Sequence, residues 1–210
     1  MTARLWSFAP APTSVQLTEI EQLLRSGGVV LLPTDTIYGL HALATDQHAA
    51  DRVAEIKGRA DTKPFVVLGS SIAGLQEIGI DIRPDLLNAL QELWPGPLTA
   101  ILPLGRPIPA SRGAATLAVR IPALDWLREL VSRTGPLLST SANRSGEPPV
   151  ESPAGLAQEL QKMLDGIADG GVSRGEPSTI VDFTGDEPRL IREGDVFFTQ
   201  KLWKTLRNSL

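Results

Sequence analysis

The sequence contains no cysteine and only two histidines, His41 and His48. The absence of cysteine excludes disulfide bonds, thiolate catalysis and thiolate metal ligands, and two histidines are too few for a histidine-rich metal site. A Ser-His-Asp triad would have to use one of these two residues. Because a lone histidine after a short strand or at a helix start is most often exposed or a cap, we expect no such triad.

Other features are also scarce. No apolar run reaches the roughly 18 residues of a membrane-spanning helix, and the first residues lack the apolar core of a secretory signal. Aromatic residues make up 5% of the chain, and the formal net charge is −4. These values argue against a globally basic nucleic-acid-binding protein, although a local basic patch is compatible with them. We expect a cytoplasmic protein that does not associate with membranes.

The short motifs of several common active sites are missing as well. The chain has no G-x-x-x-x-G-K-[ST], and no G-x-G-x-x-G follows a strand, so neither standard nucleotide cradle applies. It also has no G-x-S-x-G and no H-E-x-x-H, the motifs of many serine hydrolases and zinc proteases. A function must therefore rest on another arrangement of polar residues.

What the chain does have is apolar sequence, 42% of its 210 residues, which is enough for one sizeable core. Asp46 and Ser152 are the expected N-caps of two helices, the second with Pro153 at its first position. Apolar periodicity predicts helices over 14–26, 47–57, 84–93, 124–133, 153–164 and 196–210. Aliphatic and β-branched runs predict strands over 29–32, 64–68, 98–103, 116–121, 136–140, 178–182 and 189–192. This mixture predicts one α/β domain over 1–210, with its core at about 14–194 and a peripheral tail at 195–210.

Two of the predicted strands end in clusters of hydroxyl and amide groups. The strand over 29–32 runs into Pro-Thr-Asp-Thr at 33–36, and the strand over 136–140 runs into Ser-Thr-Ser-Ala-Asn at 139–143. Such groups can simply cap turns by bonding the local backbone. Polar residues at the strand ends of an α/β sheet are also where ligands usually bind, so both interpretations stay open.

Cations are concentrated where the second predicted helix ends. Lys57, Arg59 and Lys63 lie within seven residues, with a glycine between the first two. The helix dipole favours cations at this end, but an arginine fork and a mobile lysine also suit a polyphosphate clamp. Thr116 and Arg120 share one face of a strand, and an arginine inside an apolar run needs a carboxylate or a bound anion.

Ser178 and Arg192 give weaker signals, because each stands in a short segment with few other polar residues. Taken together, two hydroxyl-rich strand exits and several cations predict a site for a polyanion and a small polar molecule. The residues alone carry the prediction no further.

Eight segments, in this order, match the YrdC/TsaC family of threonylcarbamoyl-AMP synthases, which the chain resembles from about Gly27 to Gly194. These segments are PTDTIYGL, KGR, LWPGPLTAIL, LAVRIP, LLSTSANRSGEPP, DGG, PSTIVD and IREG. The resemblance is to the short, single-domain form. It implies a twisted mixed sheet with flanking helices around a deep cationic cavity.

The resemblance also implies an activity: threonylcarbamoyl-AMP and pyrophosphate would form from L-threonine, bicarbonate or CO2, and ATP accompanied by Mg²⁺. The product would serve threonylcarbamoyladenosine formation in tRNA, with a transient contact to tRNA or to the threonylcarbamoyl-transferase complex. It assigns catalysis to Lys57 and Arg59, and it assigns no residue as a metal ligand. The implied threonine contacts are Thr36, Arg120, Ser139 and Ser178. The implied nucleotide contacts are Lys57, Arg59, Lys63, Thr116, Ser141, Asn143 and Arg192.

Some positions depart from the family pattern. Leu68 stands where many relatives have histidine, Pro177 stands where a glutamate is usual, and GLHALA replaces GLGANA. Leu68 and Pro177 are expected near the amino-acid pocket. Two alternatives to the synthase are therefore kept: a diverged nucleotide-binding paralogue with another substrate, and an RNA-binding or ribosome-associated module on the same fold.

Overall fold

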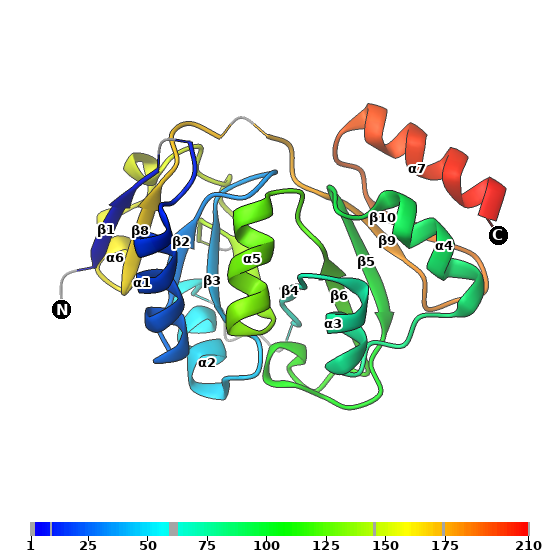
Figure 1. Ribbon diagram of the computed structural model, residues 1–210, viewed down its shortest axis with the longest axis horizontal. Coiled ribbons are helices and arrows are strands. Elements are labelled where there is room, and N and C mark those ends of the chain that lie inside the picture. Colours follow the sequence, from blue (N-terminus) through cyan, green and yellow to red (C-terminus); the bar gives the residue numbers. More distant parts are fainter. Residues whose placement is uncertain (1–2, 9, 59–62, 145, 174, 210) are drawn as a thin grey trace.

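Figure 1 shows one long mixed sheet with helices packed along it. The computed structural model describes residues 3–8, 10–58, 63–144, 146–173 and 175–209. In this part of the chain the sheet has ten strands, in the order β1-β8-β2-β3-β7-β4-β6-β5-β9-β10. The strands are β1 (Arg4–Ser7), β2 (Val30–Leu32), β3 (Gly39–Leu43), β4 (Val66–Leu68), β5 (Leu98–Pro103), β6 (Thr116–Arg120), β7 (Leu137–Ser141), β8 (Gly166–Asp169), β9 (Thr179–Asp182) and β10 (Arg189–Arg192).

The strand directions are mixed. β1 and β2 run parallel to β8, β4 runs parallel to β6, and β5 runs parallel to β9. The central strand β7 is antiparallel to both of its neighbours, β3 and β4. β7 therefore joins the two halves of the sheet, and its polar end lies between them. The predicted α/β fold with a mixed sheet is confirmed.

The helices of the described residues lie along this sheet, with α5 in front of its centre and α7 near the C-terminus (Figure 1). Asp46 caps α2 as predicted, because its side chain accepts a hydrogen bond from the Ala49 N–H. The helices are α1 (Ser14–Arg25), α2 (Gln47–Ile56), α3 (Ile72–Glu77), α4 (Pro84–Leu93), α5 (Asp125–Thr134), α6 (Gln158–Gln161) and α7 (Val196–Ser209), with 3-10 turns at Pro109–Ser111 and Pro153–Gly155.

The core has two parts, one on each side of the sheet. In β2, Leu31 belongs to the larger cluster with α2 and α4, whereas Val30 and Leu32 belong to the smaller cluster with α1 and α5. Because side chains alternate along a strand, this division places the clusters on opposite faces. Leu202 of α7 is also buried in the larger cluster, so the C-terminal helix contributes to the core.

The structure differs from the prediction at one helix, and it contains four strands and α-helices that were not predicted. The helix predicted over 153–164 is two short pieces, because Leu156 between them is buried in an extended conformation. Ser152 also makes no side-chain cap bond there. The missed elements are β1, β3, α3 and β8. β3 reads Gly-Leu-His-Ala-Leu and contains no β-branched residue. Because it is almost entirely buried, it also lacks the alternation of apolar and polar residues that marks many strands. No helix in the described residues is long and apolar enough to cross a membrane.

Candidate active site

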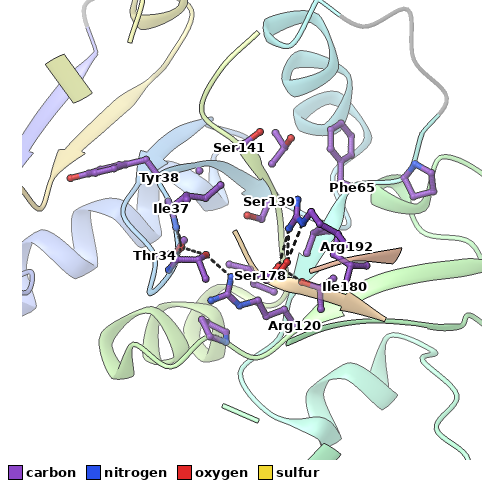
Figure 2. Close-up of a pocket in the computed structure, with 18 residues that line it drawn as sticks. Thr34, Ile37, Tyr38, Phe65, Arg120, Ser139, Ser141, Ser178, Ile180 and Arg192 are labelled. Carbon is purple, nitrogen blue, oxygen red and sulfur yellow. Dashed lines mark hydrogen bonds between the residues drawn. The ribbon is translucent and has the colours of Figure 1, made fainter. Parts of the chain in front are cut away.

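The two hydroxyl-rich strand exits open into one cavity (Figure 2). Its volume is about 220 Å³, below the roughly 300–1,000 Å³ of sites for drug-sized ligands. Residues from both halves of the sheet line it. The polar ones include Thr34, Thr36, Thr99, Arg120, Ser139, Thr140, Ser141, Ser178 and Arg192. As delimited by the described residues, the cavity has room for one small polar molecule.

The inner wall is built around Arg120, which β6 carries into the sheet. The Arg120 side chain is 6% exposed and pairs with Asp35, which is 11% exposed, at 2.6 Å between Nη2 and Oδ2. Arg120 Nη1 donates to Thr36 Oγ1 at 2.6 Å, and Nε donates to the Gly96 carbonyl at 3.1 Å. Burial lowers the pKa of Arg120, while the Asp35 charge opposes this. The arginine predicted to need a partner has Asp35 as that partner.

This wall still has hydrogen-bonding capacity to offer. Arg120 Nη2 and Asp35 Oδ1 are both buried without an aligned hydrogen-bond partner among the described residues. Although Nη2 contacts Asp35 Oδ2, a guanidinium carries five N–H donors, and the three contacts above do not use all of them. Buried polar atoms without partners are costly, and a ligand can satisfy them.

The turn at 33–36 is capped by its own side chains and also lines the cavity, while ligand binding there stays a prediction. Thr34 Oγ1 accepts from the N–H groups of Thr36 and Ile37 at 3.1 and 3.2 Å and contacts Thr36 Oγ1 at 2.9 Å. Thr34 therefore caps the turn. Thr36 is 4% exposed and its hydroxyl faces the Arg120 guanidinium. The capped turn thus holds the Thr36 hydroxyl against the guanidinium at the cavity wall.

The outer wall comes from β5, β9 and β10. Ser178 is buried just before β9, and its hydroxyl contacts Thr99 Oγ1 at 2.8 Å. Arg192 lies on the edge strand β10 and is exposed as a residue, but its guanidinium turns inward and donates to the Ser178 carbonyl at 2.8 and 3.1 Å. Desolvation and the charge of Arg120 both lower the pKa of Arg192. Two guanidinium groups therefore lie at the same cavity.

His41 does not lie where the sequence analysis expected it. It is fully buried on β3, and its Nε2 is 3.2 Å from the Ser139 hydroxyl on β7. Burial lowers its pKa to about 4. The exposed His48 at the start of α2 fits the expectation. Sequence could not reveal the His41–Ser139 pair, because the two residues are 98 positions apart.

Lys57 lies behind the cavity wall rather than on it. Its side chain is 1% exposed, and Nζ donates to the carbonyls of Ser141 and Asn143 at 2.7 and 2.6 Å and to Asn143 Oδ1 at 2.6 Å. Ser141 Oγ donates to the same Oδ1 at 2.5 Å. The ammonium group thus fixes the loop after β7, in which Ser141 lines the cavity and Asn143 does not.

Three predicted nucleotide contacts remain to be placed. Thr116 is at the far end of β6 from Arg120 and does not line the cavity. Lys63 is exposed and directly precedes Pro64, which does line it. Arg59 lies outside the described residues. The roles assigned to these three residues stay predictions.

The cavity also includes residues that the sequence analysis did not single out. Thr99 is fully buried inside the apolar strand β5, so its pattern is that of a core residue. Leu68 lines the cavity, as expected for the position where many relatives have histidine. Pro177 is not among the lining residues, although it directly precedes Ser178.

The sequence comparisons agree with this architecture. A sequence model of the Sua5/YciO/YrdC family, described as telomere recombination, matches residues 22–194. The chain belongs to this family. The threonylcarbamoyl-AMP synthase of Pyrococcus abyssi is 35% identical over 175 residues, covering 81% of this chain and 52% of the relative. The threonylcarbamoyl-AMP synthase of Xanthomonas campestris pv. campestris is 37% identical over 178 residues, covering 81% of this chain and 95% of the relative.

Among solved structures of the Sua5/YciO/YrdC family, P. abyssi Sua5 complexed with L-threonine has the same fold. The TM-score is 0.85 at 30% identity, over 96% of this chain and 61% of that chain. The chain spans about half the length of the P. abyssi synthase and nearly all of the X. campestris synthase.

Proposed function

We propose that this chain forms threonylcarbamoyl-AMP and pyrophosphate from L-threonine, bicarbonate or CO2, and ATP. One observation carries the proposal: Thr36, Arg120, Ser139 and Ser178 line a single small cavity. A buried guanidinium recognises a carboxylate, and three hydroxyls can bind the amine and hydroxyl of an amino acid. Relatives named as this synthase, and a relative in complex with L-threonine, support the assignment.

The reaction asks for positioning more than for a strong base. The threonine amine takes up CO2, loses a proton to solvent and becomes an anionic carbamate. A carbamate oxygen then forms a bond to the α-phosphorus of ATP. The bond from that phosphorus to its bridging oxygen breaks, and pyrophosphate leaves with the electron pair. Two anions must meet, so cationic groups and exact placement lower the barrier.

The residues divide this work between the two walls. Arg120 would hold the threonine carboxylate from the inner wall, where its guanidinium is already fixed by Thr36 and Gly96. Arg192 would offset phosphate charge from the outer wall, together with the predicted contacts Arg59 and Lys63. A dry, closed site would also protect the carbamate and the acyl adenylate from hydrolysis.

The contacts of Lys57 favour a role behind the cavity wall, and its predicted contact with the nucleotide stays untested. Its ammonium group is bound to the carbonyls of Ser141 and Asn143. We therefore propose that Lys57 shapes the loop at which the nucleotide binds, and that its charge acts on the nucleotide through this loop.

Mg²⁺ would arrive with ATP. Among the described residues, no group of three or more His, Cys, Asp or Glu side chains could hold a metal ion. Mg²⁺ is commonly bound through substrate phosphates with only one or two protein carboxylates. We propose that the triphosphate carries the metal, which would neutralise phosphate charge there.

The product would serve threonylcarbamoyladenosine formation in tRNA. A transient contact with tRNA or with the transferase complex would pass on the unstable adenylate. We place this activity in the cytoplasm, where ATP and tRNA are available.

The test is pyrophosphate release with ATP and bicarbonate, with and without L-threonine, and with L-serine and an amino-acid-free blank alongside. Arg59→Ala is compared with Arg207→Ala, a matched change on the exposed side of α7. We expect threonine-dependent release that collapses in Arg59→Ala and persists in Arg207→Ala. ATP binding without amino-acid-dependent release would instead identify a diverged paralogue with another substrate, in which Leu68 has altered the pocket.

A further inference from the structure

His41 and Ser139 form a cross-strand pair at the cavity. They lie directly opposite each other in the register of β3 and β7, where side chains on the same face meet. His41 Nε2 is 3.2 Å from Ser139 Oγ. His41 is fully buried and does not line the cavity, whereas Ser139 lines it (Figure 2). His41 therefore reaches the cavity through its contact with Ser139.

The backbone of β3 makes room for this arrangement. A Cβ atom at Gly39 would lie 2.8 Å from His41 Cε1 and 3.2 Å from Nε2. A larger residue at position 39 would therefore clash with the imidazole in this orientation. Gly39 precedes His41 by two residues and shares its face of the strand. The glycine and the histidine therefore form one steric unit that directs Nε2 toward β7.

The histidine stays neutral in this environment. Burial lowers its pKa from 6.5 to about 4, the Gly39 carbonyl opposes this shift, and the charge of Arg120 adds to it. A group whose pKa lies this far below 7 is almost entirely unprotonated at pH 7. It is too weak a base to take a proton from an amine. His41 Nδ1 also lacks a hydrogen-bond partner among the described residues, so nothing there completes a triad.

We propose that His41 is a positioning residue that fixes the direction of the Ser139 hydroxyl, so that this hydroxyl binds a polar group of the amino-acid substrate. A serine hydroxyl has one donor and two acceptor sites, and a neutral imidazole nitrogen takes one of them in either tautomer. The remaining sites then face the cavity at a fixed angle. That the ligand is threonine rests on the proposed function.

Two replacements separate hydrogen bonding from packing. His41→Phe keeps a ring of similar size and removes the nitrogen, whereas His41→Gln keeps a hydrogen-bonding group. A net hydrogen bond of this kind corresponds to about a 3- to 10-fold change. We expect His41→Phe and Ser139→Ala each to raise the KM for L-threonine by about that factor and the KM for ATP less than about twofold. His41→Gln should recover part of the loss.

A double-mutant cycle tests whether His41 acts through Ser139. We expect the variant with both His41→Phe and Ser139→Ala to have the threonine KM of Ser139→Ala alone, because coupled residues are not additive. Multiplying effects, or an equal rise in the KM for ATP, would overturn the proposal. If His41→Phe does not fold, the cycle is run with His41→Leu, which also removes both ring nitrogens. His48→Gln is the matched control, since His48 is exposed.

A second measurement does not depend on synthase activity. With only two histidines in the chain, ¹⁵N-histidine labelling of the protein without an affinity tag gives two sets of ring signals, and His48→Gln assigns them. We expect the His41 ring to remain neutral from pH 8 to about 5.5 and its Nε2 signal to move in Ser139→Ala. A ring that titrates near its ordinary pKa, or that ignores Ser139→Ala, overturns the pairing.

The two measurements separate failure of this inference from failure of the proposed function. If the wild type releases no pyrophosphate with L-threonine, the synthase assignment fails, and the ring signals alone decide whether His41 positions Ser139. If the wild type is active but the cycle is additive, the synthase stands and the role of His41 is wrong.

Discussion

The two arginines at the cavity present the same chemical group in opposite settings. Arg120 is buried within the sheet, pairs with Asp35 and contacts Thr36 and Gly96. Arg192 lies on an exposed edge strand, and within the described part of the chain its guanidinium bonds to Ser178. The first is fixed before any ligand arrives, and the second can adjust to its ligand. The difference suits a small carboxylate on one side and a large polyphosphate on the other.

Burial also changes what each arginine does for the folded state. A buried pair costs desolvation, but removing one member leaves the other charge without compensation. An arginine on an exposed edge strand contributes less to stability, because water can replace its contacts. Substitutions in the inner wall should therefore reduce both stability and ligand binding. Substitutions in the outer wall should reduce ligand binding alone. The following changes test this contrast, in order of their expected effect on the free energy of unfolding.

The largest effect should come from Arg120→Met. It leaves the Asp35 carboxylate buried without its partner, so we expect a loss of about 3–5 kcal/mol and no threonine-dependent activity. Urea denaturation and pyrophosphate release measure the two. Adding Asp35→Leu should restore most of the stability and none of the activity. A loss below about 1 kcal/mol in the single variant would contradict a fixed inner wall.

Next in size is a dependence of stability on pH that comes from His41. Its pKa falls from 6.5 to about 4 on folding, so between these values the unfolded chain binds a proton that the folded protein excludes. Stability from this group is present above pH 6.5 and is lost as the pH falls toward 4, by up to about 3 kcal/mol. The measurement is the difference in unfolding free energy between wild type and His41→Phe. That difference should change across this window, whereas His48→Gln should track the wild type. A constant difference would show that folding does not shift the pKa of His41.

Lys57→Met tests the layer behind the cavity. The variant keeps most of the stem and removes the ammonium group, which leaves the carbonyls of Ser141 and Asn143 without their buried donor. We expect a loss of about 1–3 kcal/mol. The KM for ATP should rise more than that for threonine, because the loop, rather than the inner wall, is disturbed. Lys204→Met on the exposed face of α7 is the control. Equal changes in both constants would argue against a role confined to the loop.

The sequence revealed those features that are local in the chain. Examples are the Asp46 cap, the apolar periodicity of α1 and the polar residues that follow β2 and β7. Each of these features involves residues that are only a few positions apart. The family resemblance assigned roles to single residues, several of which line the cavity.

What the sequence missed depends on pairing between distant strands. β3 could not be recognised, because Gly39 and His41 are explained only by their pairing with residues of β7. Thr99 was not recognised because it lies in an apolar strand, and its hydroxyl contacts a residue distant in the sequence, Ser178. The position of Lys57 was likewise decided by a loop 84 residues away. Such contacts follow from strand order, which neither periodicity nor capping encodes.

The smallest effect on stability should come from Arg192→Ala on the outer wall. The residue is exposed and its guanidinium contacts only Ser178 among the described residues, so we expect a loss below about 1 kcal/mol. Activity should still fall, with kcat/KM for ATP lower by about 10-fold and the KM for threonine nearly unchanged. Arg192→Lys should recover part of the activity, because a point charge also attracts phosphate. Thermal unfolding and steady-state kinetics decide the outcome. A stability loss as large as that of Arg120→Met would mean that both walls are fixed parts of the core, and the assignment of carboxylate to one and polyphosphate to the other would lose its physical basis.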